Sequence, residues 1–255
     1  MIHLFASDYD GTLFKDHTIR ESDLEAIRKF RALGHKFGIV TGRSINSIRT
    51  EIDKHDIPVD FVVGINGGVV LDHDYNELFA SKMDNEVADD IVNLVRDFGV
   101  EFYGTNDGYR VSREMGDGVN TIFETNVEPT DPEEIKKAGI AAMYIWSGSH
   151  ESAQKLSATI NDRFGRYGIH SYPNTSAVDV GVKDVSKSTG IEMIRNHYGY
   201  NGNVYAIGDS YNDVPMIRDF HGFLMDNGEM ELEHLAKGGL SNTVGDALTN
   251  IMNSL

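Results

Sequence analysis

Two carboxylates at the end of the first apolar segment have the spacing and the surroundings to act on a phosphate group. Asp8 and Asp10 follow Leu4–Ala6, which suits a strand buried on both faces of a parallel sheet, and Gly11 permits a sharp turn after them. In open α/β sheets, ligands bind beyond the carboxyl ends of the strands, so the pair is predicted to face a crevice. A carboxylate can attack phosphorus to form an aspartyl phosphate. Asp8 is therefore the predicted nucleophile and Asp10 the general acid and base.

Three further polar stretches, each at the end of a predicted element, complete this set. They contribute Thr41, Gly42, Lys187, Asp209, Asn212 and Asp213. Lys187 is predicted to neutralise the transferring phosphoryl group. The Thr41 hydroxyl, the Gly42 amide and Asn212 are predicted to donate hydrogen bonds to the phosphoryl oxygens. Asp213 is predicted to orient either Lys187 or the water molecules of a metal ion.

The charge of this set predicts a bound cation. One carboxylate about 4 Å from one phosphate charge costs roughly 4 kcal/mol at an effective dielectric constant of about 20, and here several carboxylates converge. One lysine cannot offset that repulsion. Mg²⁺ prefers carboxylate and carbonyl oxygens and is commonly shared with substrate phosphate. We expect Mg²⁺ to be held by the side chains of Asp8 and Asp209 and by the backbone carbonyl of Asp10.

The elements that would position these residues alternate between strands and helices. After the first strand, Ser22 and Glu25 have the spacing of a capping box, and the helix that follows includes Leu33 among its apolar residues. Strands are predicted at Lys36–Val40 and Phe61–Ile65, with a helix between them. This order is typical of a parallel sheet with right-handed crossovers. A hairpin at residues 69–80 then interrupts the alternation.

A second unit is predicted between residues 83 and 181. It begins with a helix opened by Asp84, continues through strands and the helix His150–Phe164, and ends in paired strands. Trp146 and Tyr144, which share one strand face, are predicted to pack in its core. We expect residues 1–82 and 182–255 to form an α/β domain with a doubly wound, Rossmann-like parallel sheet, into which this α+β unit is inserted. The last strand of the α/β domain is expected at residues 222–225, followed by two helices.

Composition narrows the classes of partner. The chain has 255 residues, 40% of them hydrophobic, and a net charge of -17, so nucleic acid and anionic membranes are not expected as partners. The absence of cysteine excludes disulfides, thiolate metal sites and a cysteine nucleophile. Met1–Ala6 is too short for the apolar region of a signal peptide, and no later segment is long enough to span a bilayer. A cytoplasmic protein is therefore expected, and the oligomeric state is left open.

In order along the chain, four motifs stand at Asp8–Thr12, Thr41–Arg43, Lys187 and Gly208–Asp213. This set resembles the motifs of the haloacid dehalogenase-like superfamily, and most of all those of its Cof-type sugar-phosphatase branch. Asn66-Gly67 is similar to the loop after the third strand in that branch. The resemblance covers nearly the whole chain, because members of the branch carry a large α/β cap where the insertion is predicted. It implies a Mg²⁺-dependent phosphatase with Asp8 as nucleophile, Asp10 as acid and base, and substrate choice set by the cap.

Three functions follow from these residues, in descending order of support. The first is a phosphomonoesterase for small phosphorylated metabolites, sugar phosphates foremost, since an inserted cap could close over a small substrate and exclude water. The second is a phosphohexomutase of the same superfamily, which returns the phosphoryl group to sugar. The third is a phospho-receiver signalling module, although a receiver accepts phosphate after the third strand, here Asn66–Gly68, and lacks such an insertion. The sequence leaves open whether Arg43, Tyr103, Arg110 or Asn174 contacts the substrate.

Overall fold

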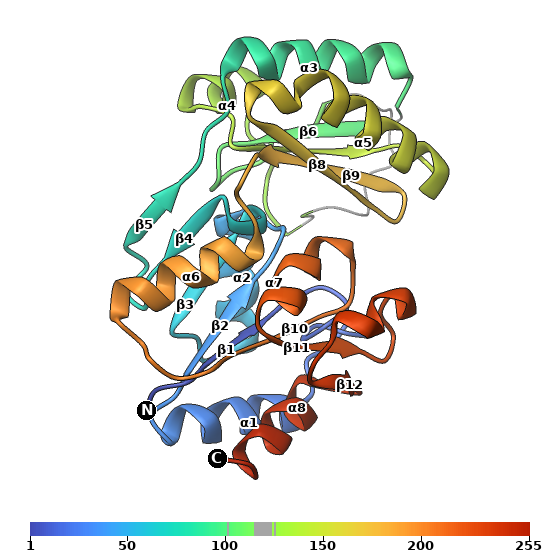
Figure 1. Ribbon diagram of the computed structural model, residues 1–255. Coiled ribbons are helices and arrows are strands. Elements are labelled where there is room, and N and C mark those ends of the chain that lie inside the picture. Colours follow the sequence, from blue (N-terminus) through green and yellow to red (C-terminus); the bar gives the residue numbers. More distant parts are fainter. Residues whose placement is uncertain (101, 115–123, 125) are drawn as a thin grey trace.

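The described part of the molecule contains two β-sheets with helices packed against them (Figure 1). The computed structural model describes residues 1–100, 102–114, 124 and 126–255. Within these residues the larger sheet has eight strands in the order β12-β11-β10-β1-β2-β3-β4-β5. Its strands are β1 (Leu4–Ser7), β2 (Lys36–Val40), β3 (Phe61–Gly64), β4 (Val69–Leu71), β5 (Glu77–Ala80), β10 (Val204–Gly208), β11 (His221–Met225) and β12 (Gly239–Ser241).

Pairing in the larger sheet is parallel from β12 across to β3. The pairs β3 with β4 and β4 with β5 are antiparallel, as the predicted hairpin requires. The carboxyl ends of β1, β2, β3 and β10 therefore lie at one edge of the sheet. The predicted α/β architecture with a mainly parallel sheet is confirmed.

Helices cover both faces of the larger sheet. They are α1 (Glu21–Ala32), α2 (Ile45–His55), α6 (Lys187–Tyr198), α7 (Val214–Asp219) and α8 (Val244–Met252). Phe5 of β1 packs with Ile27 of α1 and Leu248 of α8 in one apolar cluster. Leu4, which points to the opposite face, packs with Ile191 of α6 in another. β1 is thus buried on both faces, and this packing fixes the position of Asp8, which directly follows its carboxyl end.

The smaller sheet and its helices form a second unit, which we name the cap. In the described residues its strands pair antiparallel in the order β6-β7-β9-β8. The elements are α3 (Asn85–Phe98), β6 (Phe102–Asn106), α4 (Pro132–Ala138), β7 (Ala142–Trp146), α5 (His150–Phe164), β8 (Ile169–Asn174) and β9 (Ala177–Val182). The domain boundaries at residues 83 and 181 stay a prediction, and β9 continues one residue past the second.

Helices α3 and α5 cover one face of the cap sheet, and the other face points toward the larger sheet (Figure 1). On the covered face, Tyr103, Ile145 and Val178 pack in one cluster with Ile91 of α3 and Ile160 of α5. Strand residues alternate between faces, so the neighbours of these residues point toward the larger sheet. The uncovered face of the cap sheet therefore directs its side chains toward the edge of the larger sheet where β1 and β10 end.

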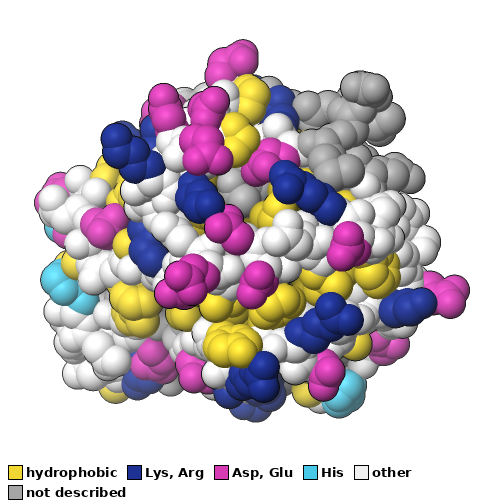
Figure 2. Space-filling view, turned by 90° about the horizontal axis from the view of Figure 1, so that it is seen from above, with side chains coloured by type: hydrophobic (Ala, Val, Ile, Leu, Met, Phe, Trp, Pro, Cys, Tyr) yellow, Lys and Arg dark blue, Asp and Glu magenta, His cyan; other side chains and the backbone are white. Residues whose placement is uncertain are grey.

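The outer face of the cap, seen from above in Figure 2, carries basic and acidic side chains intermingled with apolar ones. One of its ion pairs joins Lys136 of α4 to Asp89 of α3 at 2.8 Å, with both side chains exposed. Among the helices of the described residues, none combines the length and apolar character needed to cross a bilayer.

Three local predictions were wrong. Ser22 does not cap α1, because the helix begins at Glu21 and its N-cap, Arg20, makes no side-chain capping bond. Leu33 lies past the helix end and is 61% exposed. The region expected to be a helix after β11 is a 3-10 helix at Met230–Leu235, and β12 rather than β11 is the last strand. α7 and β12 were missed because segments of six and three residues show too little hydrophobic periodicity.

Candidate functional site

A buried lysine between two carboxylates forms the centre of the candidate site. Lys187, the first residue of α6, has no exposed surface. Its Nζ donates to Asp8 Oδ1 at 2.6 Å and to Asp213 Oδ1 at 2.5 Å. The end of β1, the turn after β10 and the start of α6 are thereby joined, although Asp8 and Lys187 are 179 residues apart. The four predicted stretches do converge at this edge of the sheet.

Glycine at position 67 lets the loop after β3 touch the start of α6. A Cβ on Gly67 would lie 2.1 Å from the carbonyl oxygen of Ser186, and its φ of +103° is in the region that favours glycine. Ser186 in turn caps α6 through a capping box with Thr189. The loop and the helix start therefore hold Lys187 in place from both sides.

The charge states of this centre follow from burial and pairing. Desolvation disfavours the charged form of Lys187, but Asp213 and Asp8 outweigh it and raise the pKa of the ammonium group. Burial raises the pKa of Asp8 above its ordinary value, while Lys187 acts in the opposite direction. The Lys187 ammonium therefore favours the carboxylate form of Asp8 against the effect of burial. An ionised, desolvated carboxylate is the state that a nucleophile needs.

Asp213 is fully buried, and both of its oxygens are engaged. Oδ1 accepts from Lys187, and Oδ2 accepts from the backbone amides of Asp209 at 3.0 Å and Ser210 at 3.1 Å. A Cβ on Gly208 would lie 2.4 Å from Asp213 Cγ, so the glycine makes room for this carboxylate. Asp213 therefore orients Lys187 and the turn that carries Asp209.

Asp8, Asp209 and Asp213 each offer one oxygen, and these atoms lie within 4.8 Å of one another. A divalent cation fits this donor set, since carboxylate oxygens suit Mg²⁺. Burial, then Asp213, raises the pKa of Asp209 to about 7. Because the oxygens of Asp213 are already bound, Asp8 and Asp209 are the side chains best placed to hold the ion. Gly11 is shaped to this cluster, because a Cβ there would lie 2.5 Å from Asp209 Oδ2.

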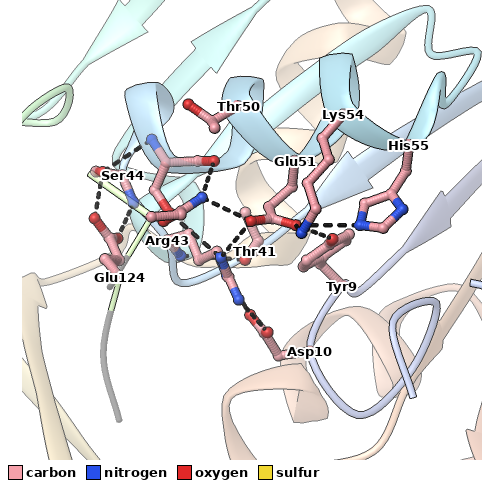
Figure 3. A network of polar contacts seen from close by, with 12 residues as sticks. Tyr9, Asp10, Thr41, Arg43, Ser44, Thr50, Glu51, Lys54, His55 and Glu124 are labelled. Carbon is pink, nitrogen blue, oxygen red and sulfur yellow. Dashed lines mark hydrogen bonds and ion pairs between the residues drawn. The ribbon is translucent and has the colours of Figure 1, made fainter. Parts of the chain in front are cut away.

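Asp10 is gripped by Arg43 (Figure 3). The guanidinium donates to both oxygens of the carboxylate, at 2.6 Å and 2.7 Å, and lies 5.1 Å from the centroid of the Tyr9 ring. Glu51 Oε1 is 3.9 Å from Arg43 Nη1. Burial favours the neutral form of Arg43, but the hydrogen bonds and charge of Asp10 outweigh it and raise its pKa. The predicted acid and base is thus held in a bidentate ion pair at the rim of the site.

Two cap residues dock on α2 beside Arg43, as Figure 3 shows for Glu124. The backbone amide and the Oγ of Ser44 both donate to Glu124, the latter at 2.5 Å. Asn126 Nδ2 donates to Glu51 Oε1 at 2.8 Å and to the Ser47 carbonyl oxygen at 3.0 Å. Burial raises the pKa of Glu124 to about 7, although the Ser44 bonds act in the opposite direction. The position of Arg43 is therefore coupled to the position of the cap.

Three of the four predicted phosphate ligands face a cavity that Asp8 and Asp10 also line, and the fourth, Lys187, is buried behind Asp8. Thr41, Gly42 and Asn212 line the cavity, and Thr41 Oγ1 accepts from the Arg43 amide at 3.1 Å. Asn212 Nδ2 donates to Asn66 Oδ1 at 3.2 Å, and Asn66 Nδ2 donates to Asp179 Oδ2 in the cap at 3.3 Å. A chain of amides thus joins the phosphate ligands to β9.

The cavity between the sheets has a volume of about 570 Å³. Asp8, Asp10 and Asp209 line its floor, and its roof comes from the cap. The prediction that Trp146 packs in the cap core is wrong, since Trp146 is half-buried and lines this cavity, whereas Tyr144 is buried as predicted and also contributes to the lining. Alternation showed that they share a face, but it could not show that α3 and α5 cover the other one.

The four side chains that the sequence left open divide evenly. Arg43 and Asn174 line the cavity. Tyr103 is buried inside the cap, where its hydroxyl donates to Glu114 at 3.0 Å. Arg110 is paired with Asp107 at 2.8 Å and does not line the cavity.

Comparison with known proteins agrees with the fold. A family profile described as haloacid dehalogenase-like hydrolase matches residues 5–252. The chain belongs to this family. The predicted resemblance to haloacid dehalogenase-like hydrolases is confirmed.

The chain is similar to 5-amino-6-(5-phospho-D-ribitylamino)uracil phosphatase YwtE of Bacillus subtilis (strain 168), with 30% sequence identity over 183 residues. The match covers 71% of the chain and 57% of that relative, so the chain spans little more than half of the length of YwtE. An HAD/COF-like hydrolase from Plasmodium vivax has a TM-score of 0.83 at 20% identity, covering 100% of this chain and 96% of that one. The HAD subclass IIB sugar phosphatase BT4131 has a TM-score of 0.79 at 22% identity, covering 100% and 98%. At these identities the two structures show a shared fold.

Three residues of this haloacid dehalogenase-like site were not predicted. Glu51 lies close to the Arg43 guanidinium, Glu124 binds Ser44 next to Arg43, and Asn126 binds Glu51. Glu51 and Asn126 are 75 residues apart, and no motif spacing links them. Of the three, only Glu51 carried a weak signal in the sequence. It lies one turn after Ser47 on the apolar face of a predicted helix, and a carboxylate is unusual at such a buried position.

Proposed function

We propose that this haloacid dehalogenase-like hydrolase is a Mg²⁺-dependent phosphomonoesterase that acts on small phosphorylated metabolites, sugar phosphates among them. The observation that carries the proposal is the contact of Lys187 Nζ with both Asp8 and Asp213, beside Asp209 and beneath a roofed cavity. The carboxyl group of Asp8 at the end of β1 is thereby fixed where a phosphate ester can reach it. The family of the chain and the phosphatases among its relatives agree with this activity.

In the first step, an oxygen of Asp8 attacks phosphorus, and the bond between phosphorus and the ester oxygen breaks. Asp10, in its protonated form, gives its proton to the departing oxygen and becomes a carboxylate. The leaving alcohol departs, and the phosphoryl group remains on Asp8. Arg43 holds Asp10 at the rim of the cavity, so its guanidinium must yield at least one hydrogen bond when the carboxyl takes up a proton.

In the second step, water attacks the phosphorus of the aspartyl phosphate. Asp10 takes a proton from that water, the bond between phosphorus and Asp8 breaks, and inorganic phosphate leaves. Thr41, Gly42 and Asn212 donate hydrogen bonds to the phosphoryl oxygens in both steps. Lys187 supplies a positive charge next to Asp8, and Asp213 keeps Lys187 in position.

Asp8, Asp209 and the backbone carbonyl of Asp10 would hold the metal ion. A bound Mg²⁺ would offset the negative charge that the phosphate and the carboxylates bring together. The cap, proposed as residues 83–181 between core segments 1–82 and 182–255, would close the site against bulk water.

The test is release of inorganic phosphate from glucose 6-phosphate, glycerol 3-phosphate and other metabolite esters, with and without Mg²⁺. We expect Mg²⁺-dependent release that Asp8→Asn abolishes. Asp90→Asn, an exposed change on α3, serves as the matched control and should keep full activity. Full activity in Asp8→Asn would refute the proposal. Isomerised sugar phosphate without phosphate release would favour the mutase, and stable phosphorylation without turnover would favour the receiver.

A further inference from the structure

The roof of the cavity is an aromatic surface on one face of the cap sheet. Phe102 of β6 pairs with Trp146 of β7, and Trp146 and Tyr144 point to the same face. The rings of Phe102 and Tyr144 are 5.4 Å apart. A Cβ on Gly104, the residue opposite Tyr144, would lie 2.5 Å from the Tyr144 ring. The glycine thus lets that ring lie against β6, with the Phe102 and Tyr144 rings tilted by 54° to each other.

The charges around this roof have one sign. Carboxylates line the cavity from the floor and from the cap, and they are Asp8, Asp10, Asp209, Glu229, Glu124 and Asp179. Among the lining residues that the structure describes, Arg43 is the one cation, and it is paired with Asp10. Residues 101, 115–123 and 125 contain no Lys, Arg or His in the sequence. The described residues with which the cap lines the cavity therefore offer hydrogen-bond acceptors and no positive charge to the part of a substrate that lies beyond its phosphate.

We propose that the cap selects phosphate esters whose leaving group carries a flat ring, bears N–H or O–H donors and has no negative charge. This inference rests on the proposed function and narrows its substrate class. A flat, unsaturated ring gains most from stacking on Trp146 and Phe102, because a puckered sugar ring has no π surface. Asp179 and Glu229, which line the cavity, would accept hydrogen bonds from the donors of the ring. An anionic leaving group would meet these carboxylates without a partner.

Five phosphate esters separate the features of the leaving group. Flavin mononucleotide offers an uncharged flat ring, thiamine monophosphate a cationic one, glucose 6-phosphate a puckered ring, glycerol 3-phosphate no ring, and 6-phosphogluconate an anionic chain. We expect kcat/KM for the two flat-ring esters to exceed that for glucose 6-phosphate by about tenfold or more, with 6-phosphogluconate the poorest. Equal or better turnover of glucose 6-phosphate or 6-phosphogluconate would overturn the inference and leave the proposed function standing. Release from none of the five esters would overturn the proposed function itself.

Variants of the roof test the same point within one enzyme. Trp146→Ala should lower kcat/KM for flavin mononucleotide by about tenfold through KM, and that for glycerol 3-phosphate by less than about threefold. Trp146→Phe should recover most of the loss. Tyr167→Ala, at a cap residue 52% exposed and away from the cavity, is the control and should change neither ester. An equal loss for both esters in a Trp146→Ala protein with unchanged thermal stability would overturn the inference.

A change of charge provides a gain of activity that general damage cannot imitate. Ala177 of β9 pairs with Trp146 of β7 and lines the cavity. Ala177→Lys should raise kcat/KM for 6-phosphogluconate by about tenfold, because it gives the anionic leaving group a partner. Ala177→Gln, of similar length without the charge, should not. A rise with Gln as large as that with Lys, or no rise with Lys, would contradict the charge argument.

Discussion

The floor and the roof of the cavity are built in opposite ways. On the floor, Asp8, Lys187 and Asp213 are buried, and each is fixed by partners whose backbone positions are set by parallel strands. On the roof, Phe102, Trp146 and Ala177 stand on the open face of an antiparallel sheet, and none of them is an ionisable group. Charge pairing holds the floor, whereas shape forms the roof. A substitution on the floor should therefore change both stability and chemistry, and one on the roof should change substrate choice.

The buried lysine should give the largest effect on stability. Lys187→Met would leave Asp8 and Asp213 as buried carboxylates without their partner, which costs about 3 to 5 kcal/mol. Urea unfolding should show this loss, and phosphate release should be lost with it. Lys136→Met breaks an ion pair of similar length on the exposed surface of the cap and should leave the urea midpoint unchanged. Similar urea midpoints for the two variants would contradict the contrast between the buried ion pairs of the floor and an exposed ion pair of the cap.

Glu124, where the roof meets the floor, should make stability depend on pH. Burial raises its pKa from 4.5 to about 7, so the folded protein binds a proton that the unfolded chain has released. The resulting stability is fully present below about pH 4.5, is lost as pH rises through 7, and amounts to about 3 kcal/mol at most. The nearby charges of Arg43 and Asp10 act on the same carboxyl.

Glu124→Gln removes this titration. The variant should lose less stability than the wild type between about pH 5 and about pH 8, when the free energy of unfolding is measured in urea. Glu133→Gln, an exposed change on α4, should follow the wild type. If Glu124→Gln also followed the wild type, the cap would not be docked through a buried carboxyl.

Gly11 offers a smaller and more local test of the floor. Gly11→Ala places a Cβ 2.5 Å from Asp209 Oδ2 at a φ of +81°, so it should displace Asp209, the proposed metal ligand, and raise the Mg²⁺ concentration for half-maximal activity by about tenfold. Gly34→Ala has nearly the same φ, +87°, but its Cβ meets open space. It should share the backbone strain of about 1 kcal/mol and leave the Mg²⁺ dependence unchanged. An equal shift in both variants would show that strain alone, and not Asp209, is responsible.

Most of the floor could be predicted from the sequence, because parallel strands bring their carboxyl ends to one edge. Asp8 and Asp209 end neighbouring strands, so their proximity follows from the order of the elements. Lys187 could be added because it starts the helix after the insertion. The bidentate grip of Arg43 on Asp10 could not be foreseen, since it depends on the directions of two long side chains and not on their positions along the chain.

The roof was harder to predict. The pattern around Trp146 shows that alternate residues share a face, but it does not show which face the helices cover. The docking of Asn126 on Glu51 joins cap and core over 75 residues, and nothing in either local sequence specifies it. Loops that follow from tertiary docking carry no periodic signal, and so the part of the site that chooses the substrate is the part that needed the structure.

The most direct test of the central claim is to locate the phosphoryl group on the enzyme during turnover. The protein would be mixed with a good ester and Mg²⁺, quenched in acid, digested and analysed by mass spectrometry. The account predicts one added phosphoryl group on the peptide that contains Asp8, and none in Asp8→Asn. A phosphoryl group on another residue, or steady turnover by Asp8→Asn, would contradict it.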